Sequence, residues 1–500
     1  MRLCEGRRWR AIAAVVGLVI LVGVSGCPDV PLLDRPRTVD WARTLTAGST
    51  SALFFAVAVD GAGNVYAAGD QYGDGTYGYG DGVEAAGSAS PRNPVLVKYN
   101  ANGEAQWVRT LTSGAGRTEF ADVAVDGTGN VYAAGSQFGV GTYNYGDGVE
   151  AAGSAFFPGG YNPVLVKYYA NGVAQWARTL TAGSDSALFW GIAVDGSGNV
   201  YAAGNQFGDG TYGYGNEVEA VGSSEWSNPV LVKYNANGLA QWARTLTAGT
   251  DDAVFFGVAV DGNANVYAAG SQSGAGTYDY GDEVQAAGAS ESTNAVLVKY
   301  NTNGEAQWAR TLTDGPGRAE FMDVAVDASG NVYAAGYQYG DGTYDYGDGV
   351  KAAGSSEWDN PVLVKYNASG VAQWARTLTE GYLGATFDGV AIDGSGNVYA
   401  AGAQLLDDIY GYGDGVQATG SAEWDNPVLV KYNANGVAQW ARTLNAGSGM
   451  ARFWGVAADG SANVYAAGYQ WDVGTYDYGD GVTATGTAVR ENSVLVKYAP

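Results

Sequence analysis

The chain has 500 residues, of which 46% are hydrophobic and 12% aromatic, and its formal net charge is −25. This composition is far too apolar for a disordered protein, and the negative charge disfavours nucleic acid and anionic lipid headgroups as partners of the folded body. There is no histidine, and the only cysteines are Cys4 and Cys27. Histidine-dependent catalysis and metal sites built from histidine or several thiolates are therefore excluded, and we expect neither a cofactor nor a metal.

The N-terminus has the organisation of a bacterial export signal. A basic start that contains Arg7 and Arg8 precedes an uncharged apolar run at residues 11–22, which is short for a membrane-spanning helix. Residues 24–27 read VSGC and resemble the lipobox of bacterial lipoproteins. We expect residues 1–26 to be a lipoprotein signal peptide, Cys27 to carry the lipid that anchors the chain in the membrane, and residues 27–37 to form a tether. The alternative is an ordinary signal peptide with a chance cysteine.

The rest of the chain, residues 38–500, is one internal repeat. The motif WARTL, or a variant that differs at one letter, occurs seven times, at a spacing of 66 residues that is 69 once. A period of this length indicates a repeat architecture rather than several domains. The repeats span residues 41–106, 107–175, 176–241, 242–307, 308–373, 374–439 and 440–500. The tryptophans of the seven motifs are Trp41, Trp107, Trp176, Trp242, Trp308, Trp374 and Trp440.

Each repeat predicts four strands. In the unit 374–439, WARTLT at 374–379 alternates in the manner of a strand, and FDGVAID at 387–393 and NVYAAG at 397–402 follow on either side of a glycine turn. After a long segment, VLVKY at 428–432 is a fourth strand, and the turn NANG returns the chain into the next WARTL strand as a hairpin. No segment has a helical period.

Seven units of four antiparallel strands predict an all-β fold, a seven-bladed β-propeller. The strand of the VAVD type, rich in small residues, suits the crowded position near the axis, and the bulky WARTL strand suits the rim. The first WARTL has no preceding VLVKY, and the last VLVKY, at 494–498, has no following WARTL. We therefore expect the N- and C-terminal strands to pair and close the ring, whereas a linear β-solenoid, the alternative, would not need complementary ends.

These motifs resemble a known family. The pattern VAVDG-x-G-NVYAAG followed by NPVLVKYNANGVAQWARTL is similar to the bacterial SBBP β-propeller repeat over all seven units. The resemblance implies an exported or envelope propeller and no particular activity. The shorter stretch NANGVAQW is also similar to the W-motif of quinoprotein-type propellers, including an outer-membrane lipoprotein that assists membrane-protein assembly, although those propellers have eight shorter blades.

Most of the charged residues recur in every unit, which favours a structural role. Asp195 and its counterparts precede a G-x-G-N turn and are expected to cap backbone N–H groups there. Calcium at paired carboxylates such as Asp345 with Asp348, or Asp477 with Asp480, is an alternative. The recurring arginines of WARTL and lysines of VLVKY predict a ring of structural contacts, with the repeated acids as candidate partners. A glycosidase would need two neighbouring acids in one unit only.

The long segments between the third and fourth strands break the repeat and are where binding is expected. Three of them, residues 223–229, 355–361 and 421–427, contain a tryptophan directly after a glutamate. An aromatic ring beside a carboxylate suits a sugar, so Trp226, Trp358 and Trp424 are candidate ligand-binding residues. The alternative is that each packs against the neighbouring blade.

Together these observations predict a non-enzymatic, lipid-anchored binding module, a monomer on the outer membrane or cell surface of a bacterium, for a glycan, matrix or protein ligand. A periplasmic scaffold for envelope or outer-membrane protein assembly is one alternative, and a glycosidase of the carboxylate type is another.

Overall fold

The computed structural model describes residues 38–88, 91–114, 116–154 and 159–500. These ranges contain 42 β-strands and no helix, so no helix within them could cross a membrane. The predicted signal peptide, Cys27 and the tether lie outside the described residues, and the lipidation of Cys27 stays a prediction.

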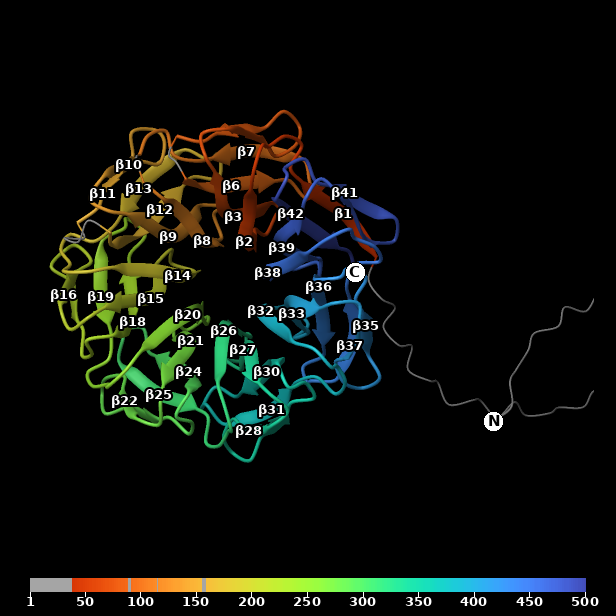
Figure 1. Cartoon of the computed structure of the whole chain (residues 1–500). Helices are drawn as coiled ribbons and strands as arrows, with labels where there is room; N and C mark the ends of the chain where they lie inside the picture. The colour runs from red at the N-terminus through yellow and green to blue at the C-terminus, as the bar shows by residue number, and fades with distance from the viewer. Residues whose placement is uncertain (1–37, 89–90, 115, 155–158) are drawn as a thin grey trace, which may run out of the picture. The chain divides into compact units, whose positions relative to one another are not determined.

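The strands form seven antiparallel sheets of four, the blades, arranged in a ring (Figure 1). The innermost strands are β2 (Ala52–Val59), β8 (Thr118–Val125), β14 (Ala187–Val194), β20 (Ala253–Val260), β26 (Ala319–Val326), β32 (Ala385–Ile392) and β38 (Ala451–Ala458). The second strands are β3 (Val65–Tyr72), β9 (Val131–Phe138), β15 (Val200–Phe207), β21 (Val266–Ser273), β27 (Val332–Tyr339), β33 (Val398–Leu405) and β39 (Val464–Trp471).

The outer half of each blade contains the VLVKY and WARTL strands. The third strands are β6 (Arg92–Tyr99), β12 (Tyr161–Tyr168), β18 (Ser227–Tyr234), β24 (Thr293–Tyr300), β30 (Asp359–Tyr366), β36 (Asp425–Tyr432) and β42 (Glu491–Tyr498). The outermost strands are β7 (Ala105–Arg109), β13 (Ala174–Arg178), β19 (Ala240–Arg244), β25 (Ala306–Thr311), β31 (Ala372–Arg376), β37 (Ala438–Arg442) and β1 (Val39–Thr44). The predicted seven-bladed propeller, with VAVD-type strands inside and WARTL strands at the rim, is confirmed.

The long segment of each repeat adds a small hairpin that the sequence analysis did not predict. The seven hairpins are β4 (Thr76–Gly78) with β5 (Glu84–Ala86), β10 (Thr142–Asn144) with β11 (Glu150–Ala152), β16 (Thr211–Gly213) with β17 (Glu219–Val221), β22 (Thr277–Asp279) with β23 (Gln285–Ala287), β28 (Thr343–Asp345) with β29 (Lys351–Ala353), β34 (Ile409–Gly411) with β35 (Gln417–Thr419), and β40 (Thr475–Gly479) with β41 (Val482–Thr485). Each hairpin buries two tyrosines, such as Tyr212 and Tyr214 in blade 3.

The ring is closed by the two ends of the propeller. Strand β1 pairs with β42, with Ala42 opposite Val496 and Thr44 opposite Val494, and completes the seventh blade, β38-β39-β42-β1. The predicted closure is therefore confirmed, and the linear solenoid is wrong. The hydrophobic core is shared between neighbours: Tyr132 and Leu165 of blade 2 pack with Phe189 of blade 3 in one buried cluster.

The basic residues of the rim clamp each blade to the next one. Nε of Arg178 on β13 donates to the carbonyl of Gly238 at 2.6 Å, and Nζ of Lys167 donates to the carbonyl of Ala236 at 3.1 Å, both in a turn of blade 3. The Arg178 guanidinium also lies 5.0 Å from the ring of Trp176. The expected ring of structural contacts is thus present, but its main partners are backbone carbonyls rather than the repeated acids.

The repeated acids serve the turns. Asp195 accepts hydrogen bonds from the backbone N–H groups of Ser197 and Asn199, both at 2.9 Å, which confirms the capping role. In the Y-G-D-G loops, Asp348 accepts the backbone N–H of Ala372 at 2.9 Å. No group of three or more acidic side chains is placed to hold a metal ion in the part of the chain that the structure describes.

Candidate ligand-binding site at the mouth of the axial channel

The two faces of the ring differ in how strictly they repeat. The turns from first to second and from third to fourth strands lie on one face, and they keep the D-x-x-x-N and N-x-x-G types nearly throughout. The opposite face holds the beginnings of the first and third strands, and here the residues change from blade to blade. We call it the variable face. The residue before the innermost strand is Ser51, Arg117, Ser186, Asp252, Arg318, Gly384 or Met450, and the third strand begins with Arg92, Tyr161, Ser227, Thr293, Asp359, Asp425 or Glu491.

The same variation continues at one position inside the innermost strands. In blade 3, Phe189 pairs with Gly204 and Gly191 with Ala203, so Trp190 is skipped and forms a β-bulge. Bulges commonly redirect a side chain near a functional site. The skipped residues of the seven blades are half-buried, and they are Phe55, Ala121, Trp190, Phe256, Met322, Asp388 and Trp454.

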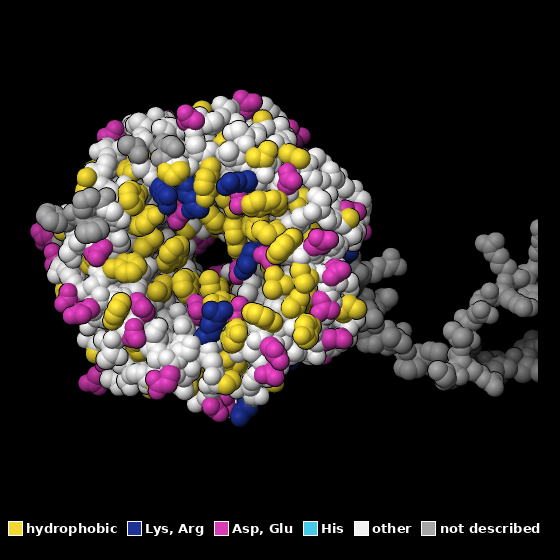
Figure 2. Space-filling model, in the orientation of Figure 1, with side chains coloured by type: hydrophobic (Ala, Val, Ile, Leu, Met, Phe, Trp, Pro, Cys, Tyr) yellow, Lys and Arg dark blue, Asp and Glu magenta, His cyan; other side chains and the backbone are white. Residues whose placement is uncertain are grey.

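These seven residues, together with Glu119 and Arg452, line a cavity of about 480 Å³. Because each innermost strand contributes to its wall, the cavity lies on the axis of the ring, and we call it the axial cavity. Figure 2 shows the central opening ringed by hydrophobic side chains, with a few basic and acidic side chains among them. A concave, mainly apolar cavity with few polar groups is the usual form of a ligand site.

The aromatic side chains of the axial cavity are held in place from behind. The rings of Phe55 and Trp454, from neighbouring blades, are 5.0 Å apart, and Tyr469 on β39 lies 5.0 Å behind Trp454. Nε1 of Trp190 donates to Oδ1 of Asn205 at 2.9 Å. Asn205 in turn donates to Ser227 Oγ at 2.7 Å. The wall is therefore preorganised by residues of the second and third strands.

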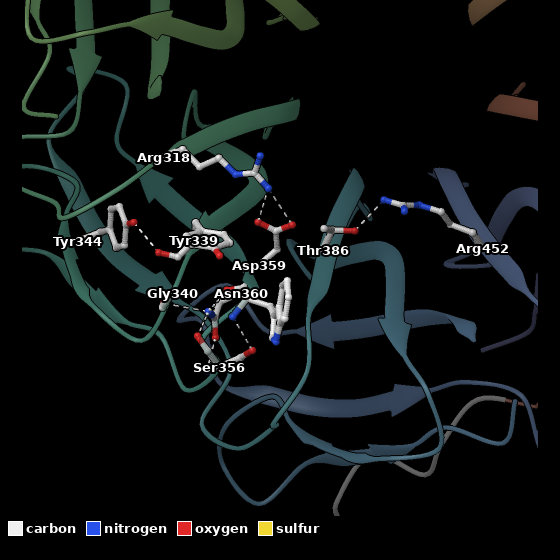
Figure 3. Close-up of polar contacts among 10 residues, drawn as sticks. Arg318, Tyr339, Gly340, Tyr344, Ser356, Asp359, Asn360, Thr386 and Arg452 are labelled. Carbon is white, nitrogen blue, oxygen red and sulfur yellow. Dashed lines mark hydrogen bonds and ion pairs between the residues drawn. The ribbon is translucent and has the colours of Figure 1, made fainter. Parts of the chain in front are cut away.

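Two arginines pair with carboxylates that line the axial cavity, Asp388 and Glu119. Arg452 donates to both oxygens of Asp388 at 2.8 Å and to Thr386, the contact drawn in Figure 3. Arg92 lies 2.7 Å from Glu119 and 3.2 Å from Asp70. Burial raises the pKa of Asp70 to about 8.

Two further carboxylates lie in the channel wall and directly follow residues that line the axial cavity. Oδ2 of Asp122 accepts the backbone N–H of Ile192 in the next blade at 2.8 Å, and Oδ2 of Asp323 accepts that of Val390 at 2.8 Å. Burial raises the pKa of Asp122 to about 8, with a contribution from the charge of Asp323, and burial raises the pKa of Asp323 to about 6. In the other blades this position is alanine or glycine.

We expect these two carboxylates to make the propeller less stable as the pH rises. Their pKa values are higher in the folded protein than in the unfolded chain. Their contribution to the free energy of unfolding is therefore complete below pH 4 and is lost as the pH rises through about 6 and 8. The Asp122→Ala/Asp323→Ala variant copies blade 1, which has Ala56 here, and should reduce the loss between pH 5 and 9 by up to about 5 kcal/mol. Urea unfolding at several pH values measures this, and parallel pH profiles for variant and wild type would contradict it.

The three predicted loop tryptophans lie on the same variable face but outside the axial cavity. Trp226, Trp358 and Trp424 each directly precede a third strand and are 59%, 53% and 61% exposed. Their backbone carbonyls anchor the loops, as when Trp226 accepts the N–H of Gly208 at 2.8 Å. Ligand binding by these side chains stays a prediction.

The residues of the axial cavity were missed by sequence reasoning. The sequence does contain a feature that could have indicated them. One position in the otherwise repetitive innermost strand varies between Phe, Ala, Trp, Met and Asp.

No family model and no curated protein match the chain, so the resemblance to SBBP repeats rests on its motifs alone. A solved protein of unknown function from Dyadobacter fermentans is 10% identical, with a TM-score of 0.41 over 77% of this chain and 95% of that chain. An ulvan lyase of polysaccharide lyase family 25 is 11% identical, with a TM-score of 0.40 over 86% and 93%. A rhamnogalacturonan lyase is 13% identical, with a TM-score of 0.23 over 88% and 70%. Similarity this low does not bear on function.

Proposed function

We propose that the protein is a non-enzymatic binding module of the bacterial envelope that holds its ligand in the axial cavity. The proposal rests on the position of the residues that differ between the seven repeats. Residues that serve only the scaffold can be the same in every blade, as they are in the turns of the opposite face. The side chains that differ gather around one preorganised aromatic cavity, where a ligand would meet a different residue from each blade.

The two acids of the sixth repeat near this cavity are arranged for binding rather than catalysis. Asp388 and Asp425 both belong to the sixth repeat and lie 2.7 Å and 3.9 Å from the Arg452 guanidinium, so neighbouring acids of one unit do occur here. Both oxygens of Asp388 accept hydrogen bonds from Arg452. A carboxylate held in this way is poorly suited to act as a general acid or base, which must exchange a proton with the substrate.

The proposal is tested by comparing two sets of tryptophan and phenylalanine variants on a broad array of glycans and peptides. The Trp190→Ala/Phe256→Ala/Trp454→Ala variant removes three walls of the axial cavity, and blade 2 already has alanine, Ala121, at this position. We expect it to lose binding. The Trp226→Ala/Trp358→Ala/Trp424→Ala variant is the matched control and should retain it. Loss of binding only in the second variant would place the site in the loops instead, and an array without any ligand would count against a binding module.

For the location we propose anchoring through Cys27 at the cell surface. Protease treatment of intact cells should then degrade the propeller. Protection of the protein in intact cells, with cleavage after the outer membrane is opened, would favour the periplasmic scaffold.

A further inference from the structure

The charged side chains that line the axial cavity, and the indole N–H of Trp190, already have partners within the protein. Glu119 is paired with Arg92, and Asp388 is paired with Arg452. The indole N–H of Trp190 donates to Asn205. A sugar needs hydrogen-bond donors and acceptors that are free to meet its hydroxyl groups, and an anion needs an uncommitted cation. What the cavity offers to a ligand is mainly the faces and edges of aromatic rings.

The innermost strands carry more acidic than basic residues. The seven innermost strands contain five acidic residues and one basic residue, Arg452, which is itself paired with Asp388; the acids are Glu119, Asp122, Glu320, Asp323 and Asp388. Asp122 and Asp323 are both ionised only above pH 8, because their pKa values are about 8 and 6. The hydrogen bonds that they accept come from backbone N–H groups, so their charge is not balanced by a paired cation in those contacts. A cation in the cavity would therefore be attracted by these two carboxylates.

We propose that the axial cavity is an aromatic cage for an organic ammonium group, a deeper form of the proposed function on which it rests. Aromatic rings attract a cation through their negative faces, and Phe55, Trp190, Phe256 and Trp454 approach the cavity from four different blades. Met322 adds a polarisable wall. A methylated ammonium fits best, because it has a positive charge and an apolar surface and needs few or no hydrogen bonds.

The test compares choline with 3,3-dimethylbutan-1-ol, which has the same shape but no charge. Binding to the full chain, purified in a maltoside detergent, is measured by calorimetry at pH 8.5, above the pKa values of about 8 and 6 for Asp122 and Asp323. We expect choline to bind at least about tenfold more tightly than the neutral alcohol. Equal affinity of the two probes, or no binding of choline, would overturn the cage.

Variants then locate the site. Trp190→Ala should weaken choline binding about tenfold, and Asp122→Ala/Asp323→Ala should weaken it while leaving the affinity for the neutral alcohol unchanged. Trp226→Ala, in the exposed loop, is the matched control and should bind as the wild type does. Near-ultraviolet circular dichroism verifies that each variant is folded. Choline binding that survives Trp190→Ala in a folded protein would contradict the proposal.

Two further probes distinguish the source of the ammonium group. A trimethyl-lysine peptide represents a modified protein, and vesicles of phosphatidylcholine represent a lipid headgroup. Binding of either probe that is lost in Trp190→Ala supports the cage and identifies the source of the ammonium group. Arrays on which glycans or unmethylated peptides bind through the axial cavity while none of the ammonium probes binds would overturn the cage and leave the proposed binding module standing.

Discussion

A chain that begins at residue 47 is expected to melt far below one that begins at residue 38. The shorter chain lacks β1, which pairs with β42 and buries Trp41 to 6% exposure. Burying one tryptophan contributes at most about 4–6 kcal/mol, a large part of the roughly 5–15 kcal/mol by which domains are stable. The loss also removes a contact between blades 7 and 1 at the rim, because Arg43 on β1 donates to the carbonyl of Gly103 in blade 1 at 2.7 Å.

Differential scanning calorimetry of the two chains measures this effect. The chain that begins at residue 38 is the control, since both lack the same N-terminal segment. Restoring the strand as a synthetic peptide of residues 38–46 should raise the melting temperature again, because the exposed edge of β42 can pair with it. Identical melting curves for the two chains would show that the pairing of the ends does not stabilise the ring.

The second large effect is expected from Gly204→Ala in β15. A Cβ atom at Gly204 would lie 1.9 Å from the carbonyl oxygen of Leu188, which belongs to the backbone of β14 and cannot move without disturbing the sheet. Gly204 pairs with Phe189, directly beside the bulge that turns Trp190 into the axial cavity. We expect a loss of about 3 kcal/mol or more, and a displaced Trp190.

Gly196→Ala is the matched control in the same blade. No atom lies within 4 Å of the position that its Cβ would occupy, so the free energy of unfolding should change by no more than about 0.5 kcal/mol. Urea unfolding followed by tryptophan fluorescence measures both variants. A Gly204→Ala protein as stable as Gly196→Ala would mean that the strands at the bulge can separate more easily than the structure indicates.

Removal of β1 and Gly204→Ala both change the scaffold that positions the residues of the axial cavity. The glycine of VYAAG allows the innermost strand to approach closely and bulge, and closure of the ring brings Trp454 of the last blade beside Phe55 of the first, at 5.0 Å. A loss of either feature should therefore reduce ligand binding along with stability.

The number of blades, the order of their strands and the closure of the ring could all be predicted from the amino-acid sequence. These features follow from local alternation, turn residues and a repeat whose ends are complementary, and none of them requires knowledge of distant contacts. The capping role of Asp195 was equally local, because its partners Ser197 and Asn199 lie within four residues of it.

The candidate ligand site, in contrast, could be located only from the tertiary structure. Phe55, Trp190, Phe256 and Trp454 are far apart along the chain, and each follows a phenylalanine in a strand whose sequence is typical of a buried core. The register of the second strand decides that the first aromatic residue packs between blades and the next one bulges into the channel. The ring then brings together side chains from all seven blades, an arrangement that no single repeat contains.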